Sequence, residues 1–289
     1  MPRPLLLTQP RGAWRLRHIV TGDDIYGGTS RLLSRVAPAA GITVSHVDMC
    51  DNDAVRKAMQ PNTSLVWMES PTNPRMQVTD VAAVAALARS RGALSLVDNS
   101  IMAPVLQQPL ELGADISMTS ATKFVAGHSD VTAGILSVKG DELAEAVYFL
   151  QNSEGGGLAP YDCWLCLVRP TTGGLNPRTS TDQSLSLSAA RARLMAPCLL
   201  TRDGPVVSAQ RGLKTMALRM RQQQSNCMAI AQWLQAHPLV RKINYPGLPT
   251  DPGYALQMRQ ASRSPAPACA ALRQPSSRAS SQPSRAAFP

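Results

Sequence analysis

The chain has 289 residues and a formal net charge of +10 at pH 7, so it is long enough to bury the core of at least one large domain. Its excess of arginine is concentrated in three segments of irregular composition, residues 1–20, 168–210 and 259–289. Because the remaining chain is slightly acidic, we expect no basic groove for nucleic acid. No apolar run approaches the roughly 20 residues that cross a bilayer, so we expect no membrane association.

Short apolar runs alternate with helical periodicity between residues 21 and 167. Buried strands are predicted at 64–68, 93–97, 115–119 and 134–138, and a helix is predicted at 78–89. Continuous apolar strands that alternate with helices are typical of a mostly parallel sheet flanked by helices. The sequence therefore predicts an α/β fold with functional groups at the ends of the strands.

The pattern changes after residue 167. Residues 168–210 are rich in turn residues and serine and show no clear periodicity, a helix is predicted over 211–235, and a strand is predicted over 240–245. After about residue 258 the Ser-, Pro-, Ala- and Arg-rich composition predicts disorder. The predicted organisation is an irregular basic N-terminus (1–20), the first part of a large domain (21–167), an insertion (168–210), a helix completing that domain (211–235), the start of a C-terminal domain (236–258) and a disordered basic tail (259–289).

The sequence contains six cysteines. Cys163 and Cys166 form the one close pair, and no second pair of Cys or His residues completes a zinc site, so no metal is predicted. We interpret Cys163 and Cys166 as buried core residues and the other four as free thiols of a reducing compartment.

Polar motifs follow three of the predicted strands, and a fourth stands in a glycine-rich turn near the start of the large domain. The motifs are Glu69-Ser70-Pro71-Thr72-Asn73-Pro74, Asp98-Asn99-Ser100, Ser120-Ala121-Thr122-Lys123 and Asp23-Asp24-Ile25-Tyr26-Gly27-Gly28. Because an open α/β sheet presents its ligand sites beyond the strand ends, these motifs are expected to converge.

Together the motifs supply one candidate for each group that a pyridoxal-type cofactor needs. Lys123 offers an amine for a Schiff base, and Asp98 offers an acid that keeps a pyridine nitrogen protonated. Ser120 and Thr122 offer hydroxyls for a phosphate, and Tyr26 offers an aromatic face. Each residue also has an ordinary structural explanation, such as a solvated lysine or a helix-capping aspartate, so the prediction depends on their order and spacing together.

The same motifs, extended by Phe124-Val125-Ala126-Gly127-His128-Ser129-Asp130, resemble the Cys/Met-metabolism branch of fold-type I pyridoxal-phosphate enzymes. The resemblance covers residues 21–167 and 211–258 almost without gaps. It implies that the α/β part is the large, cofactor-binding domain of that fold type, and that the cofactor is pyridoxal 5′-phosphate.

The resemblance also implies a role for each site residue. Lys123 would bind the cofactor covalently and then remove the substrate's α-proton, with help from Tyr26, which stacks on the ring. Asp98 would pair with the ring nitrogen, and Ser120 and Thr122 would bind the phosphate. In addition, Asn73 would lie near the ring hydroxyl and the substrate carboxylate. We expect the Lys123 amine to be buried, because a desolvated lysine is the better base at neutral pH.

Within the family, residues 148–155 and 158–167 look most like the plant and algal branch that cleaves cystathionine at its β carbon. The implied reaction yields homocysteine, pyruvate and ammonia and belongs to transsulfuration and methionine biosynthesis. The γ-lyases and γ-synthases of the family share most of the site, so γ-elimination or synthesis is the first alternative.

Three departures from the family pattern leave a second alternative, an inactive fragment or a subunit without activity of its own. The segment that precedes Asp24 in the family has no match in residues 1–20. Residues 168–210 interrupt the match, and their limits are compatible with either a translated intron or a surface insertion. The match ends near Met258, so the fold is expected to be truncated at both ends, without the arginine that binds the substrate carboxylate in the family.

The resemblance implies a homo-oligomer, a dimer of dimers, although the residues that share sites between subunits have no match in this chain. Its similarity to plant enzymes implies a chloroplast or other plastid, and the alternative is the cytoplasm. The Arg-bearing, acid-free residues 1–20 are compatible with a transit peptide.

Overall fold

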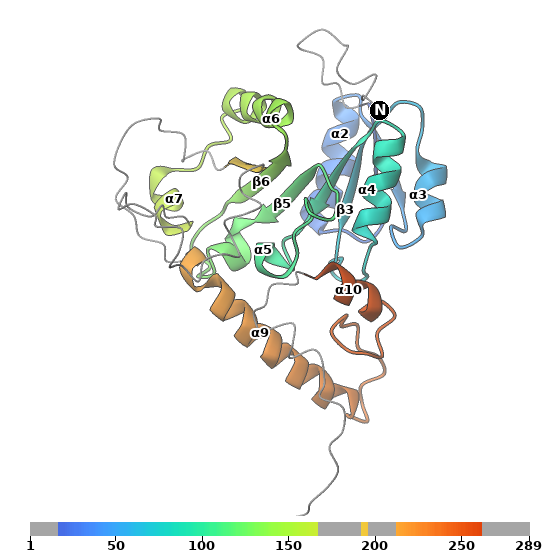
Figure 1. Cartoon of the computed structure of the whole chain (residues 1–289), viewed down its shortest axis with the longest axis vertical. Coiled ribbons are helices and arrows are strands. Elements are labelled where there is room, and N and C mark those ends of the chain that lie inside the picture. Colours follow the sequence, from blue (N-terminus) through green and yellow to red (C-terminus); the bar gives the residue numbers. More distant parts are fainter. Residues whose placement is uncertain (1–16, 167–191, 196–211, 262–289) are drawn as a thin grey trace, which may run out of the picture.

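The computed structural model describes residues 17–166, 192–195 and 212–261. Within them a 7-stranded sheet has the order β2-β1-β3-β4-β5-β6-β7. Strands β1 to β5 run parallel, and β6 is antiparallel to both of its neighbours. The predicted α/β fold with a mostly parallel sheet is confirmed (Figure 1). The strands are β1 His18–Gly22, β2 Thr43–Val47, β3 Thr63–Glu69, β4 Leu94–Asp98, β5 Ile116–Ser120, β6 Gly134–Lys139 and β7 Ala192–Met195.

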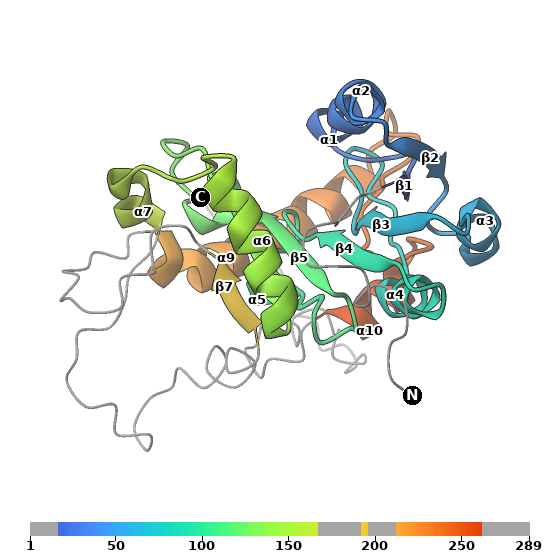
Figure 2. The ribbon, with the colours of Figure 1, turned by 90° about the horizontal axis from the view of Figure 1, so that it is seen from above.

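Helices lie on both faces of this sheet (Figure 2). Most of them are short, whereas α9 has 24 residues and extends away from the sheet (Figure 1). The helical segments are α1 Gly27–Arg31, η1 Leu32–Val36, α2 Ala37–Ala39, α3 Asn52–Ala58, α4 Val81–Ser90, α5 Ala103–Leu106, η2 Ala121–Val125, α6 Asp141–Ser153, α7 Pro160–Cys166, α9 Gly212–Gln235 and α10 Tyr254–Gln260. In the part of the chain that the structure describes, no helix is long and apolar enough to span a membrane.

The strands build two cores because successive side chains on a strand point to opposite faces. Val20 and Val66 face a core shared with α3 and α4, whereas their neighbours Ile19 and Leu65 face a core shared with η1, α2 and α6. Burying such a side chain contributes about 1.5–3 kcal/mol. The sheet is therefore covered on both faces, and its polar groups are left at the strand ends.

Several predicted elements are observed within a residue or two of their expected limits. Strands β3, β4, β5 and β6 match the predicted strands, and α9 matches the helix predicted over 211–235. Helix α4 begins at Val81, three residues later than predicted, because the Asp80 carboxylate accepts the Ala83 N–H at 3.0 Å and caps the helix there. These elements have the strongest apolar patterns and the clearest boundary residues.

Strand β1 begins at His18, so the prediction of an irregular segment extending to residue 20 was wrong. The buried His18 ring lies between two strands, with Nδ1 2.8 Å from the Thr63 hydroxyl and Nε2 2.9 Å from the Ser45 hydroxyl. A buried histidine is compatible with a strand here because both ring nitrogens have partners.

The strand predicted over residues 240–245 is also wrong, since this segment has no β pairing. The Tyr245 N–H instead bonds to the Asp251 carboxylate at 3.1 Å, which stabilises a turn. Helix α10 was not predicted and extends past residue 258, where disorder was expected to begin. Strand β7 lies within residues 168–210, so the prediction of an irregular segment there was wrong at Ala192–Met195. The rest of that segment and most of 1–20 and 259–289 lie outside the described residues.

Two cysteines, Cys50 and Cys227, are free thiols, as expected. Cys163 is buried, as expected, but it is also disulfide-bonded, which the sequence analysis did not predict. In the described ranges, no group of three or more His, Cys, Asp or Glu side chains could hold a metal ion.

Candidate active site

The four sequence motifs leave the same edge of the sheet. Strands β3 and β4 are parallel and in register, with Glu69 opposite Asp98, and Asp98 is opposite Met118 on β5. Strand β1 lies on the other side of β3. Because parallel neighbours end at one edge, the loops after β1, β3, β4 and β5 adjoin one another (Figure 2). The predicted convergence is therefore what the sheet topology produces.

Asp98 is the last residue of β4, and its side chain is only 5% exposed. Burial raises the pKa of this carboxyl, while hydrogen bonds from the Ser100 side chain and backbone oppose the shift. The Ser100 N–H lies 2.9 Å from Oδ1. Among the described residues no cation pairs with Asp98. A buried, unpaired carboxylate is costly, so a cationic ligand would be stabilised here.

A chain of hydrogen bonds connects Asp98 to the segment that carries Lys123. The Ser100 hydroxyl bonds to the Asp98 carboxylate and also accepts the N–H of Ser120 at 2.8 Å. Ser120 ends β5, and η2, which follows at once, contains Lys123. The acid and the lysine are therefore held on adjacent, cross-linked strand ends.

Lys123 is exposed to solvent, so the expectation of a buried amine was wrong for this chain. Its backbone dihedrals, φ −86° and ψ −115°, depart from helical values inside η2. Helix α9 contacts η2 directly after Lys123, at the Phe124 carbonyl, and leaves the lysine side chain exposed.

Arg219 of α9 fixes the chain just after Lys123. Its Nη2 donates to the carbonyl oxygens of Phe124 and Gly212 at 2.8 Å and 2.7 Å. Gly127 has φ +71°, and a Cβ built on it would lie 2.1 Å from Arg219 Nη1. The guanidinium therefore lies directly against the Gly127 backbone, where only glycine leaves space.

This packing predicts an unusually large effect for Gly127→Ala. The substitution adds left-handed strain of about 1–2 kcal/mol and also displaces Arg219 from the Phe124 carbonyl. The matched control is Gly41→Ala, because Gly41 has φ +76° and open space around a Cβ. In urea denaturation we expect Gly127→Ala to lose at least about 1 kcal/mol more than Gly41→Ala. Equal losses would contradict the proposed role of the Arg219 contact.

The two predicted phosphate ligands differ in their surroundings. In the described structure the Ser120 hydroxyl has no protein partner. The Thr122 hydroxyl, by contrast, accepts the Ala133 N–H at 2.8 Å and lies 3.3 Å from the Ala133 carbonyl oxygen. Ser120 is therefore free to contact a phosphate, whereas Thr122 would have to exchange an internal hydrogen bond for one to the ligand.

Tyr26 and Asn73 lie in the loops after β1 and β3. Tyr26 is 51% exposed, which excludes the interpretation as a core tyrosine, and its ring packs so closely on Gly28 that a Cβ there would lie 2.5 Å from Cε1. Asn73 is also exposed. Both side chains are therefore accessible to a ligand at this edge of the sheet.

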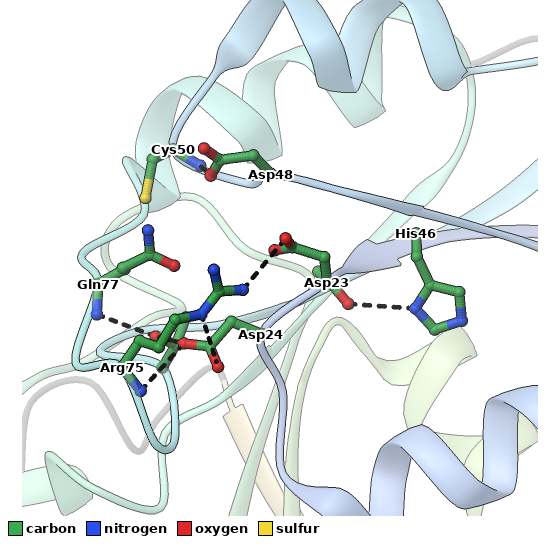
Figure 3. A network of polar contacts seen from close by, with 9 residues as sticks. Asp23, Asp24, His46, Asp48, Cys50, Arg75 and Gln77 are labelled. Atoms are coloured by element: carbon green, nitrogen blue, oxygen red, sulfur yellow. Dashed lines mark hydrogen bonds and ion pairs between the residues drawn. The ribbon is translucent and has the colours of Figure 1, made fainter.

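The residues that connect these two loops were not identified from the sequence. Arg75 pairs with Asp23 at 3.1 Å and with Asp24 at 3.2 Å, and the Thr72 hydroxyl donates to the buried Asp24 carboxylate (Figure 3). The Arg75 N–H bonds to Asp24 as well, at 3.2 Å. The sequence motifs contained Asp23, Asp24 and Thr72 but not Arg75, and no local pattern indicated that Arg75 joins the two loops.

Cys50 lies close to this network (Figure 3). Burial first, and then Asp48, raise the pKa of its thiol to about 11. The thiol therefore stays protonated at neutral pH and is a poor candidate for a nucleophile.

Comparison with known proteins identifies the family of this chain. The model of the Cys/Met metabolism PLP-dependent enzymes matches residues 15–191 and 203–275. The chain belongs to this family. Over 243 residues it is 50% identical to a chloroplastic cystathionine beta-lyase from Arabidopsis thaliana and 47% identical to one from Mimosa pudica. It is 39% identical to a probable cystathionine gamma-synthase from Herpetosiphon aurantiacus.

Solved structures give the same result. A cystathionine gamma-lyase from Lactobacillus plantarum, complexed with L-serine, superposes with a TM-score of 0.69 at 36% identity. The alignment covers 85% of this chain and 53% of that protein. The chain likewise spans 43% of the Arabidopsis protein, although the match includes 84% of the chain. This member of the family therefore corresponds to about half the length of its relatives.

The residues at the sheet edge fit the cofactor that this family uses. In the described part of the chain the buried Asp98 carboxylate has no cationic partner, and a protonated pyridine nitrogen would supply one. The Ser120 hydroxyl and the exposed Lys123 amine are available on the neighbouring strand end. The fit of the site to the cofactor depends on Asp98, Ser120 and Lys123, which the fold places at adjacent strand ends.

Proposed function

We propose that this protein is a pyridoxal-phosphate-dependent carbon–sulfur lyase that carries out β-elimination of cystathionine, giving homocysteine, pyruvate and ammonia. The observation that carries the proposal is the buried Asp98 carboxylate, which has no cationic partner among the described residues and is hydrogen-bonded through Ser100 to the strand end that precedes Lys123. The identity of 50% to the Arabidopsis beta-lyase, against 39% to the probable gamma-synthase, favours this substrate and bond.

The proposed roles follow from the position of each residue. Asp98 would hold a proton on the ring nitrogen, which is the charge that its buried carboxylate lacks. The Ser120 hydroxyl and, after exchanging its Ala133 bond, the Thr122 hydroxyl would bind the phosphate. The exposed ring of Tyr26 would cover the cofactor face, and Asn73 would lie near the ring hydroxyl and the substrate carboxylate.

When bound, pyridoxal phosphate supplies an aldehyde that bonds to amines and a protonated ring that withdraws electrons. In this proposal Lys123 Nζ would hold the cofactor and, when not bonded to it, would take the substrate's α-proton. Tyr26 assists this transfer from its position at the start of α1. The overall reaction would break the bond between the β carbon and sulfur, release the protonated sulfur as homocysteine, and consume one water to give pyruvate and ammonia.

A γ-directed activity is the second candidate. Its support is the 38% identity to a mouse cystathionine gamma-lyase and the structural match to the Lactobacillus gamma-lyase. The two reactions release different products from cystathionine: β-elimination gives homocysteine and pyruvate, and γ-elimination gives cysteine and 2-oxobutyrate.

We also propose that the chain works as a homo-oligomer in a plastid. The exposure of Lys123 and Tyr26 supports an oligomer, because a second copy would exclude water from the reacting groups. The chloroplastic relatives from Arabidopsis and Mimosa support the plastid.

The test of the proposed function is a product assay. Purified protein is incubated with pyridoxal phosphate and cystathionine, and thiols and 2-oxo acids are identified by mass spectrometry. We expect homocysteine and pyruvate in equal amounts, and neither product from a matched Lys123→Ala preparation. Cysteine with 2-oxobutyrate would instead support the γ-directed candidate, and no product from folded, cofactor-loaded protein would refute both.

A further inference from the structure

Glu69 connects two of the loops that form the candidate site. It is the last residue of β3, and its side chain is 5% exposed. Its Oε2 accepts the backbone N–H of Tyr26 at 2.9 Å, and its carboxylate also accepts the backbone N–H of Asn73. One buried carboxylate therefore holds the loop after β1 and the turn after β3 in a fixed relation.

Two other acids face Glu69. Asp98 lies opposite it in the register of β3 and β4, and Asp24 lies in the loop after β1. The neighbouring cation, Arg75, is already paired with Asp23 and Asp24 (Figure 3). Glu69 therefore has no cation of its own among the groups that act on it in the described structure.

Burial first, and then the repulsion from Asp98 and Asp24, raise the pKa of Glu69 to about 7, against the lowering effect of the Tyr26 and Asn73 hydrogen bonds. The carboxyl therefore changes its charge close to neutral pH. A carboxylate accepts N–H bonds at both oxygens more strongly than a neutral acid, whose hydroxyl is a donor.

We propose that Glu69 is a positioning residue that fixes the Tyr26 loop to the Asn73 turn, and that it makes both hydrogen bonds fully only when it is ionised. The inference rests on the proposed function in one respect, because that function assigns Tyr26 and Asn73 to the cofactor. Ionisation of Glu69 then tightens the two loops around the cofactor, and its protonation loosens them.

Ionisation of Glu69 orders the loops around the site, but it lowers the unfolding free energy of the cofactor-free protein. Because the folded pKa of Glu69 is raised, the folded state binds the proton more tightly than the unfolded state. Stability therefore falls as pH rises from about 4.5 to about 7 and stays lowered above that range. Ionised Glu69 thus lowers the stability of the fold while it orders the site. A residue with only a structural role would instead raise the stability, so the two roles can be distinguished.

The experiment compares the wild type with Glu69→Gln, which keeps the size of the side chain but cannot ionise. The control is Glu145→Gln, the same chemical change at an exposed position of α6. The affinity for pyridoxal phosphate is measured by visible absorbance titration from pH 5.5 to 8.5. We expect Glu69→Gln to bind about tenfold more weakly at pH 8 and within twofold of wild type at pH 5.5.

A second measurement tests the Tyr26 and Asn73 hydrogen bonds to Glu69 in the absence of the cofactor. In cofactor-free protein at pH 8, we expect the protection of the Tyr26 and Asn73 amides against hydrogen exchange to fall about tenfold in Glu69→Gln. Its urea midpoint at that pH should be no lower than that of wild type, and Glu145→Gln should change neither quantity.

The outcomes separate this inference from the proposed function. Wild-type protein that binds no pyridoxal phosphate overturns the proposed function, and the exchange data alone then decide whether Glu69 holds the two loops. Wild-type binding with a parallel pH profile in Glu69→Gln, or unchanged protection of both amides, overturns the role of Glu69 and leaves the proposed function standing.

Discussion

Asp98→Asn is expected to make the cofactor-free protein more stable and to weaken its binding of the cofactor. Burial raises the pKa of Asp98, so the unfolding free energy of the wild type decreases as pH rises above the ordinary aspartate pKa. Asparagine has the same shape, can keep the Ser100 N–H bond and does not ionise. At pH 7 the variant should therefore unfold at a higher urea concentration than the wild type.

The same substitution is unfavourable for binding of pyridoxal phosphate, because asparagine gives the ring nitrogen no negative partner. Loss of a charge-assisted hydrogen bond costs roughly 1.5–3 kcal/mol, so we expect about 10- to 100-fold weaker cofactor binding by absorbance titration. Asp115→Asn is the control, since Asp115 is also buried but lies at the opposite end of β5, where it accepts hydrogen bonds from Ser95. If Asp98→Asn bound the cofactor as tightly as wild type, Asp98 would not be the ring-nitrogen partner.

Lys123→Ala is expected to have the largest effect on activity. It removes both the amine that holds the cofactor and the proposed base, and loss of a base alone lowers turnover by roughly 10²–10⁴-fold. The absorbance band that belongs to the covalent bond between lysine and cofactor should disappear, and product formation should fall to background. The change in stability should be small, because Lys123 is exposed and its backbone is held by Arg219 through Phe124.

Lys139→Ala is the matched control for this variant, since Lys139 is an exposed lysine at the end of the neighbouring strand β6. It should keep both the absorbance and the activity. A Lys123→Ala protein that retained its absorbance would place the covalent bond elsewhere and would contradict the assignment.

The parallel sheet could be predicted because its central strands are short apolar runs with sharp polar ends. Val66 and Val97 are fully buried in strands whose limits were predicted within a residue or two. Strand β2 was missed because it is an edge strand with no fully buried side chain, and β1 was missed because it begins with a histidine. Edge strands carry a weaker apolar signal, and a buried polar residue reveals its partners only in the folded structure.

The sequence predicted which motifs form the site, but it did not predict the hydrogen bonds that join their loops. The strand ends brought Asp98 and the Lys123 segment to one edge, as parallel pairing requires. The bonds from Arg219 to Phe124 and from Glu69 to Tyr26 join residues 95 and 43 positions apart. Contacts of that kind depend on loop conformations that no local sequence pattern specifies.

The most direct test of the cofactor assignment is to find which amine holds pyridoxal phosphate. The complex is reduced with borohydride, digested and mapped by mass spectrometry, with Lys57, Lys139, Lys214 and Lys242 as the internal controls, since the chain has no other lysines besides Lys123. We predict stoichiometric labelling on the peptide that contains Lys123, and at most trace labelling elsewhere. Labelling spread over several lysines, or absent from Lys123 in folded protein, would contradict the account.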